Sequence, residues 1–324
     1  MLNKFLNNGN EGKNNWWRYL ITIILSWGVA EIIAGFTLGF LIASYFIASG
    51  NFDINYFINY IMDYESNINL FFIMTFFSFS FSMLFLFFSL KLIHKRDFMS
   101  LVNISKKYDE FSGKTINWIK RVRWRQIIKG ALIWLVFLIV MLLISIILDP
   151  SGFNINFNIG NLYLTILLFI LAIPIQVLFE ELFFRGYINQ GLSLKIKSPI
   201  IVILISSFVF SLGHIINGGT DPIFMVSNIV ITFMMGMIFS VATLATNGIE
   251  WAVGAHLINN FFAFIISSSE GSFGSFETII QSTNLTDPLI DFIFSVIALL
   301  IFAIILFFYK KEKILKGLDT KHNL

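Results

Sequence analysis

The sequence predicts an all-α, polytopic membrane protein with about eight transmembrane helices and both termini in the cytoplasm. The composition, the apolar runs and the alternation of charge between those runs carry this prediction. Hydrophobic residues make up 57% of the 324 residues and charged residues 13%, and the mean hydropathy is +0.81, whereas soluble domains contain about 25% charged residues. The chain has no cysteine, which excludes disulfides, thiolate metal ligands and a cysteine nucleophile.

Eight apolar runs approach or exceed the ~20 residues that a helix needs to cross a bilayer. They cover residues 19–46, 69–93, 127–148, 162–190, 199–217, 223–245, 249–268 and 288–309. The first run has no small-residue cleavage site and is too long for the core of a signal peptide, so we expect it to be retained. Trp16, Trp17 and Tyr19 at its entrance are typical of the membrane interface.

The segments between these runs alternate in charge. The first loop is acidic and has no base, with Asp53, Asp63 and Glu65, and the fifth has only Asp221. The loop 94–126 and the C-terminal tail are basic, with Lys95, Arg96, Lys106, Lys107, Lys114, Lys120, Arg121, Arg123 and Arg125 in the loop and Lys310, Lys311, Lys313, Lys316 and Lys321 in the tail. The positive-inside rule therefore places both termini in the cytoplasm.

We expect three regions along the chain. Residues 1–160 hold three transmembrane helices and the basic loop 94–126, residues 161–268 form a four-helix core, and residues 269–324 hold the last helix and the tail. The end of the basic loop mixes tryptophan with arginine and lysine, which favours an interfacial helix on anionic lipid. Nothing in the sequence favours a nucleic-acid partner.

Two adjacent acids, Glu180 and Glu181, lie inside the fourth apolar run. A charged side chain deep in a bilayer costs about 2.5–3.5 kcal/mol on insertion scales, so such residues usually mark ion pathways, proton relays or catalysis. Glu181 and Arg185 are four residues apart and are expected to form an ion pair. Glu180 points about 100° away on the helix and is the freer carboxylate, able to face a cavity.

The depth of these residues depends on how far their helices extend. Glu180 lies near the middle of the bilayer only if its helix continues past Arg185 to about Leu192, and no proline interrupts that stretch. His214 lies roughly 22 Å into its run and His256 roughly 10 Å into its own, at 1.5 Å per residue. Asn260 is one turn beyond His256 and shares its face, so this pair could hold a water or donate hydrogen bonds to an oxyanion.

Three motifs follow one another in the core: Glu180-Glu181-x-x-x-Arg185, Phe210-x-x-x-His214 and His256-x-x-x-Asn260. In order and placement this set resembles the CAAX protease and bacteriocin-processing family of intramembrane proteases, also called CPBP or Abi. The resemblance implies an eight-helix fold and peptide hydrolysis in the membrane. It implies that Glu180 activates water with help from His214, and that His256 and Asn260 bind the oxyanion or position the water. Glu181 and Arg185 would orient the motif helix.

The cofactor follows from neither the motifs nor the resemblance. Glu180, His214 and His256 could supply the three protein ligands of a catalytic zinc site. No His-Glu-x-x-His is present, and one carboxylate would have to be a ligand while another acted as base. We therefore favour a metal-free enzyme and keep zinc as the alternative. The rhomboid-type and aspartyl-type signatures of other intramembrane proteases are absent from the sequence.

Two other functions stay open. One is a non-proteolytic partner, such as a bacteriocin self-immunity protein or a scaffold for a membrane regulator. The other is a transporter in which Glu31, Glu180 and His214 relay protons, although the paired repeats of many transporters are not seen. Glu31 has a second interpretation, a hydrogen bond to a neighbouring helix.

The partners follow from the same patterns. The expected substrate is a membrane-anchored or leader peptide, and Gly35-x-x-x-Gly39 predicts close helix packing within the fold or across a homodimer. The 39 phenylalanines and the frequent isoleucine and asparagine favour an AT-rich bacterial source, and hence a bacterial cell membrane.

Overall fold

A computed structural model describes residues 3–50, 53–62, 67–105, 108, 115–155, 162–215, 222–269, 278–282 and 288–318. The N-terminal elements are α1 (Lys4–Asn7), the 3-10 turn η1 (Asn8–Asn10), α2 (Trp16–Ile23), the π-helical η2 (Ile24–Val29), α3 (Ala30–Ala48), α4 (Ile54–Met62), α5 (Ile68–Phe88), the π-helical η4 (Ser89–His94), the 3-10 turn η5 (Phe98–Leu101), α6 (Trp118–Arg121) and α7 (Trp124–Leu148). The remaining elements are η6 (Pro150–Gly152), β1 (Phe153–Ile155), α8 (Leu162–Glu180), the π-helical η7 (Glu181–Ile188), α9 (Asn189–Ser193), α10 (Pro199–Leu212), α11 (Pro222–Thr246), α12 (Glu250–Phe261), the π-helical η9 (Phe262–Ile266), β2 (Ser267–Ser269), β3 (Ile280–Ser282) and α13 (Pro288–Leu318).

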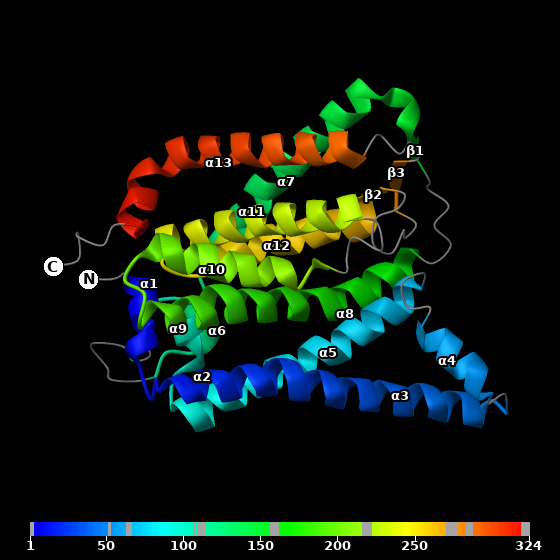
Figure 1. Cartoon of the computed structure of the whole chain (residues 1–324), viewed down its shortest axis with the longest axis horizontal. Helices are drawn as coiled ribbons and strands as arrows, with labels where there is room; N and C mark the ends of the chain where they lie inside the picture. Colours follow the sequence, from blue (N-terminus) through cyan, green and yellow to red (C-terminus); the bar gives the residue numbers. More distant parts are fainter. Residues whose placement is uncertain are drawn as a thin grey trace.

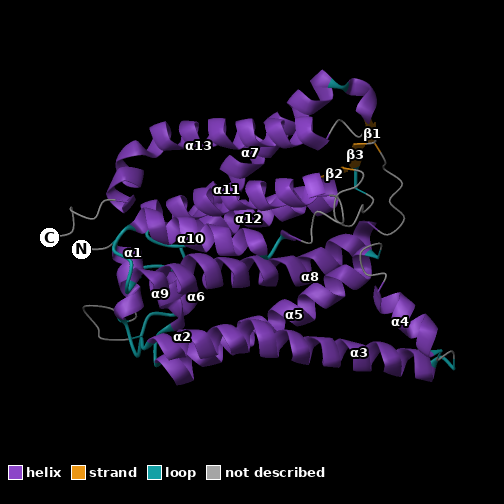
Figure 2. Cartoon of the chain, in the orientation of Figure 1, coloured by secondary structure: helices purple, strands orange, loops and turns teal. Residues whose placement is uncertain are grey.

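The fold is an all-α, multi-pass membrane bundle, as predicted. Helix α8 runs through the middle, with α5 and α3 packed on one side and α10, α11 and α12 on the other (Figure 1). Helix α7 packs against α12, and α13 packs against α11. The three short strands form one sheet in the order β1-β3-β2, at the end of the bundle away from the termini (Figure 2).

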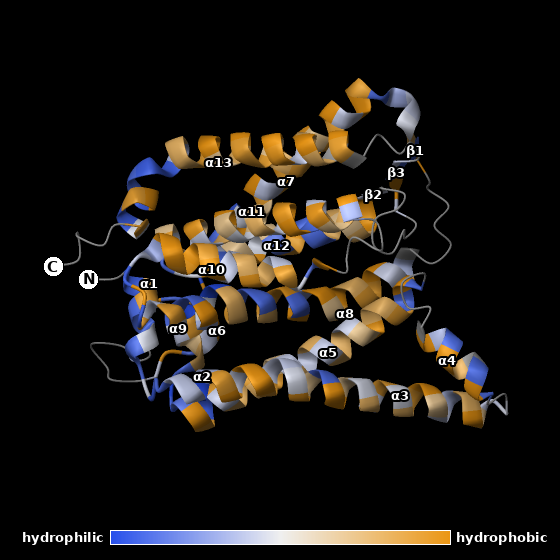
Figure 3. Ribbon diagram, in the orientation of Figure 1, coloured by the Kyte–Doolittle hydropathy of each residue, from blue (hydrophilic) through white to orange (hydrophobic). Residues whose placement is uncertain are grey.

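The outer faces of the long helices are apolar (Figure 3). Large hydrophobic side chains on α3, α7 and α13 are exposed, among them Phe36, Ile147 and Ile305. A soluble protein would expose a patch of this size only at a binding surface, whereas in a membrane protein such faces contact lipid.

The predicted count of eight spans is not confirmed. Six described helices are long and apolar enough to cross a membrane: Trp16–Ala48, Ile68–His94, Trp124–Leu148, Tyr163–Ser193, Pro222–Thr246 and Phe292–Leu318. The expected span 199–217 corresponds to a shorter helix, because α10 ends at Leu212 just before Gly213. The expected span 249–268 corresponds to α12 and η9, which together cover Glu250–Ile266. Helix α10 is apolar and exposes one face, whereas α12 packs against α7, α11 and α8.

Both termini lie at one end of the bundle (Figure 1). The Asn3 side chain fixes this arrangement, since its Nδ2 donates to the carbonyls of Leu244, at 3.0 Å, and Gly317, at 3.1 Å. Helices α6 and α9 lie at the same end, which agrees with the charge pattern. The cytoplasmic assignment stays a prediction. Several of the charges used for it lie outside the described residues: Asp63, Glu65, Lys106, Lys107, Lys114, Asp221 and Lys321.

The glycine motif in α3 does not mediate packing within the fold. A Cβ atom built on Gly35 or Gly39 would meet nothing within 4 Å. The expectation of close packing inside the chain is therefore wrong, and the homodimer stays a prediction. Close packing instead occurs between α7 and α12, where a Cβ on Gly130 would overlap the Trp251 carbonyl and one on Gly254 would overlap the Ile127 carbonyl.

We expect Gly130→Ala to destabilise the protein by about 1–3 kcal/mol, because an added methyl group must push the backbone of α12 away from α7. The measurement is thermal unfolding of the purified protein in detergent. Gly35→Ala is the matched control, since it adds the same methyl group to a helix in open space. Equal melting temperatures for the two variants would contradict the packing described here.

Candidate active site

The helix that carries the two glutamates is continuous. Helices α8, η7 and α9 follow without a break, so the described span extends from Tyr163 to Ser193. This confirms the expectation that the helix continues past Arg185 to about Leu192. The segment Glu181–Ile188 is π-helical, a rare geometry that often occurs at functional sites.

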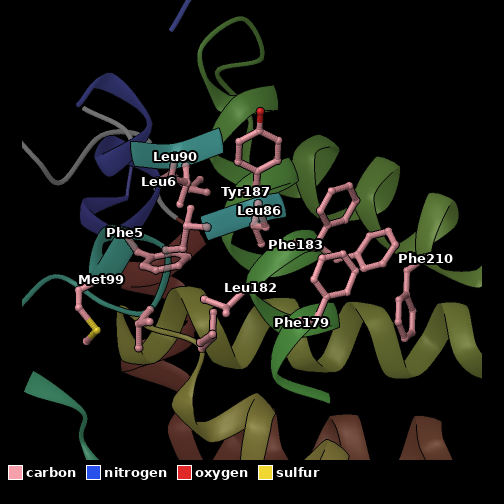
Figure 4. Packing of buried hydrophobic residues seen from close by; sticks show 14 of the residues in the cluster. Phe5, Leu6, Leu86, Leu90, Met99, Phe179, Leu182, Phe183, Tyr187 and Phe210 are labelled. Carbon is pink, nitrogen blue, oxygen red and sulfur yellow. The ribbon is translucent and has the colours of Figure 1, made fainter. Parts of the chain in front are cut away.

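A core of aromatic and aliphatic side chains holds this segment in place. Phe179, Leu182, Phe183 and Tyr187 pack with residues of α1, η4 and α10, as Figure 4 shows. Phe179 and Phe183 stack with ring centroids 5.4 Å apart. Because each of these side chains is buried, the rotation of the helix about its axis is defined at Glu180 and Glu181.

Four ionisable side chains meet inside the bundle. Glu180 is 4% exposed, Glu181 0%, Arg185 1% and His256 4%. The Nη1 atom of Arg185 lies 3.1 Å from Oε1 of Glu181, which confirms the predicted ion pair. Buried charges are tolerated only where they are paired, so this pair is part of the folded core.

His256 joins the two glutamates. Its Nδ1 lies 2.8 Å from Oε1 of Glu181, and its Nε2 lies 3.6 Å from Oε2 of Glu180. The two nitrogens lie on opposite sides of the imidazole ring, so one histidine can address two carboxylates that point in different directions. The sequence placed His256 with Asn260 and did not predict either contact with a glutamate.

Aromatic rings enclose the cluster. The Arg185 guanidinium lies 4.2 Å from the centroid of the Phe210 ring and 5.6 Å from that of Phe239. The Phe239 ring is also 5.9 Å from the His256 ring, centroid to centroid. Such faces stabilise a desolvated cation and exclude water from around it. Phe239, on α11, was missed from the sequence because nothing in its spacing distinguishes it from other core aromatics.

Gln176 is a second residue that sequence reasoning missed. It lies one turn before Glu180, and its Nε2 donates to Oε1 of Glu180 at 3.2 Å. An amide four residues before an acid, within an apolar run, is the pattern that could have pointed to it. Oε2 of Glu180 is buried and accepts no hydrogen bond from the described residues. Glu180 thus has one oxygen held and the other directed towards His256.

His214 is not part of this cluster. It lies just beyond the end of α10, where its Nδ1 donates to the Phe210 carbonyl at 3.0 Å. Within the described residues, no hydrogen bond or ion pair joins it to Glu180. The Phe210 ring lies between the two histidines, with its centroid 4.6 Å from the His214 ring and 6.2 Å from the His256 ring. Phe210 is therefore the link between the second motif and the cluster.

Asn260 lies on α12 one turn beyond His256, as predicted, and is oriented by its neighbours. Trp134 Nε1 donates to Oδ1 of Asn259 at 3.2 Å, and Asn259 Nδ2 donates to Oδ1 of Asn260 at 3.3 Å. With its oxygen engaged, Asn260 presents its amide N–H groups to another acceptor. No hydrogen bond joins Asn260 to the four ionisable side chains within the described residues.

The zinc site considered from the sequence does not form. The described residues, which include Glu180, His214 and His256, contain no group of three or more His, Cys, Asp or Glu side chains that could hold a metal ion. These residues therefore do not form the three-ligand set of a catalytic zinc.

Glu31, the remaining acid of the membrane runs, lies outside the cluster. Its two carboxylate oxygens accept from the Ser78 hydroxyl on α5, each at 2.5 Å. The interpretation of Glu31 as a hydrogen-bonding partner of a neighbouring helix is confirmed.

Comparisons with known proteins agree with the motifs. Residues 161–262 match the family model Rce1-like, described as type II CAAX prenyl endopeptidase Rce1-like. The chain is 25% identical over 307 residues to the uncharacterized protein YyaK of Bacillus subtilis (strain 168). This match covers 94% of this chain and 95% of YyaK. No solved structure matches. The predicted resemblance is confirmed over the segment that carries the three motifs, and the match points to CAAX-type intramembrane protease activity.

Proposed function

We propose that this chain, similar over residues 161–262 to the type II CAAX prenyl endopeptidases, hydrolyses peptide bonds in the membrane with a water molecule activated by Glu180. The observation that carries the proposal is the buried cluster of Glu180, Glu181, Arg185 and His256. An apolar bundle has no structural need for two carboxylates joined by one histidine, whereas water activation needs such groups.

Arg185 and Glu181 act by positioning His256. Arg185 is cationic at any working pH, and its charge offsets that of Glu181. Glu181 accepts the Nδ1 proton of His256, which fixes the tautomer and the orientation of the ring. The other ring nitrogen, Nε2, then faces Glu180. In the same way, the aspartate of a Ser-His-Asp triad accepts a hydrogen bond from Nδ1 of the histidine and orients its ring.

Glu180 and His256 Nε2 would hold the attacking water. Their 3.6 Å separation is longer than a direct hydrogen bond, a distance at which a bridging water should be considered. Glu180 takes a proton from this water as the water oxygen bonds to the substrate carbonyl carbon. The resulting tetrahedral oxyanion collapses, the C–N bond breaks, and Glu180 returns the proton to the leaving amine.

Asn260 and His214 complete the proposed site. The amide N–H groups of Asn260 are suited to the oxyanion, because its oxygen is already engaged by Asn259. His214 donates from Nδ1 to the Phe210 carbonyl, so Nε2 is the ring nitrogen left for the predicted role of assisting the base. The proposed substrate is a membrane-anchored or leader peptide that reaches this site from within the bilayer.

The transporter and scaffold alternatives gain no support. Glu31, which the proton relay required, bonds to Ser78 rather than to the cluster. A scaffold would not need Oε2 of Glu180 to be buried without a hydrogen bond from the described residues, an arrangement that costs stability unless it serves chemistry.

The test compares membranes that contain the wild-type protein with membranes that contain the double variant Glu180→Gln/His256→Gln. Peptides released into the soluble fraction and truncated membrane proteins are identified by mass spectrometry. We expect a set of cleavage products that appear only with the wild-type protein, and these also identify the substrates. Identical product profiles, at equal amounts of folded protein, would contradict the proposed function.

A further inference from the structure

A groove with a volume of about 640 Å³ lies at the end of the bundle that holds the termini. Helices α7, α11 and α13 form its walls, and no residue of the candidate active site lines it. Its basic lining residues are Lys4, Arg123, Lys129, Lys310, Lys313 and Lys316, and its apolar lining residues include Ile133, Val241, Ala242, Trp251, Leu306 and Ile314. Among the described residues, no acid lines the groove.

A bend in α13 creates the basic wall. Lys310 has non-helical backbone angles, φ −126° and ψ 25°, and the helix turns there across the end of the bundle (Figure 1). The turned segment is fixed in place, because the Gly317 carbonyl accepts from Asn3 and a Cβ on Gly317 would lie 3.0 Å from the backbone of Leu244 and Ala245. The groove is therefore part of the fold and does not depend on a loose tail.

Positive charge exceeds negative charge in the turned segment of α13, which carries Lys310, Lys311, Lys313 and Lys316 against Glu312. Arg123 is paired with Glu250 and does not contribute a free charge. Within the described residues, none of the lysines of the groove forms an ion pair, and Lys310 lies 4.0 Å from the centroid of the Tyr309 ring. A cluster of lysines with an excess of positive charge attracts a ligand with negative charge.

The position of the groove selects the kind of anion. Figure 3 shows that α13 changes from hydrophobic to hydrophilic where it bends. The groove is lined by Leu306 from the part before the bend and by Lys310, Lys313 and Lys316 from the bend onward. Trp124 at the start of α7 and Tyr309 beside Lys310 on α13 are both exposed, and such rings favour the headgroup region of a bilayer. A ligand with an anionic headgroup and a long apolar chain matches both the basic and the apolar lining residues of the groove.

We propose that this groove binds one anionic phospholipid, with its phosphate among Lys129, Lys313 and Lys316 and an acyl chain along Ile133 and Leu306. Basic pockets between membrane helices on the cytoplasmic side bind anionic headgroups in this way. A neutral phospholipid has no net negative charge to pair with the lysines. A free phosphate has no acyl chain to contact the apolar residues of the groove.

The test uses the purified full-length protein in detergent and native mass spectrometry. The protein is titrated with phosphatidylglycerol, phosphatidylcholine or soluble glycerol 3-phosphate. The groove variant Lys129→Gln/Lys313→Gln/Lys316→Gln removes three exposed charges, and the control Lys91→Gln/Lys195→Gln/Lys197→Gln removes three exposed charges elsewhere at the basic end. Thermal unfolding of each variant verifies that it folds.

We expect one phosphatidylglycerol to bind in preference to phosphatidylcholine, about tenfold or more weaker binding by the groove variant, and wild-type binding by the control. Equal losses in both variants would show general attraction by the basic surface and overturn the proposal. Equal binding of phosphatidylcholine, or full competition by glycerol 3-phosphate, would overturn it as well. Because none of these measurements involves peptide cleavage, failure here leaves the proposed peptidase function intact.

Discussion

We expect Glu180→Gln to lower the rate of peptide cleavage by about 10²–10⁴-fold, the usual contribution of a general base. The carboxamide has nearly the same shape and can still accept from Gln176, so the core around it should be preserved. It cannot take a proton from water. The measurement is single-turnover cleavage, by the purified enzyme, of a peptide identified among the released products.

Glu31→Gln is the matched control for this experiment. It removes the same charge from another membrane helix, at a position that bonds to Ser78 and not to the cluster. Its cleavage rate should equal that of the wild-type protein. If Glu180→Gln retained wild-type activity at an unchanged melting temperature, Glu180 would not be the base.

The second large effect concerns stability. We expect Arg185→Met to destabilise the protein by about 3–5 kcal/mol, since it leaves the fully buried Glu181 carboxylate without its cationic partner. The double variant Glu181→Gln/Arg185→Met removes both charges and should recover most of that loss. The introduced carboxamide oxygen can still accept from His256 Nδ1.

Thermal unfolding of the wild-type protein, both single variants and the double variant gives the coupling between the two residues. A double variant that melts as low as Arg185→Met would indicate that Arg185 stabilises the fold through its contacts with Phe210 and Phe239 instead. Cleavage activity separates positioning from stability. Although folded, the double variant should cleave slowly, because without Arg185 and the Glu181 carboxylate the His256 ring is oriented less firmly towards Glu180.

Patterns over a few residues of sequence predicted the features that depend on the geometry of a single helix. The four-residue spacing of Glu181 and Arg185 predicted their ion pair, and the lack of an interrupting proline predicted the continuous helix beyond Arg185. The alternation of charge agreed with both termini lying at one end of the bundle. Such features follow from helix periodicity and from the cost of placing charge in lipid.

Contacts between distant segments were not predictable in the same way. Helix periodicity assigned Glu180 and Glu181 to different faces and left Glu180 free, yet both reach His256, which lies 75 residues beyond Glu181 in the chain. The π-helical segment that begins at Glu181 is one reason, because it departs from the rotation per residue assumed for an α-helix. The other reason is that an imidazole has nitrogens on two sides.

The placement of His214 illustrates a further limit. The predicted depth of His214 in the membrane assumes a helix that extends to residue 217. Because α10 ends at Leu212, His214 follows the helix instead of lying within it. The apolar composition of a run does not determine where its helix stops. The expected span 249–268, in contrast, agrees within two residues at each end with α12 and η9 together, and Asn247, with φ 54°, and Gly248 lie in the turn that precedes it.

The most direct test of the central claim is a single turnover of the wild-type enzyme in H₂¹⁸O, followed by mass spectrometry of the product and of the protein. If Glu180 activates water that attacks the substrate itself, the new C-terminal carboxyl group of the product gains one ¹⁸O and the protein gains none. If the first-turnover product contained only ¹⁶O and the label appeared in the Glu180 side chain, Glu180 would be a nucleophile and the proposed mechanism would be wrong.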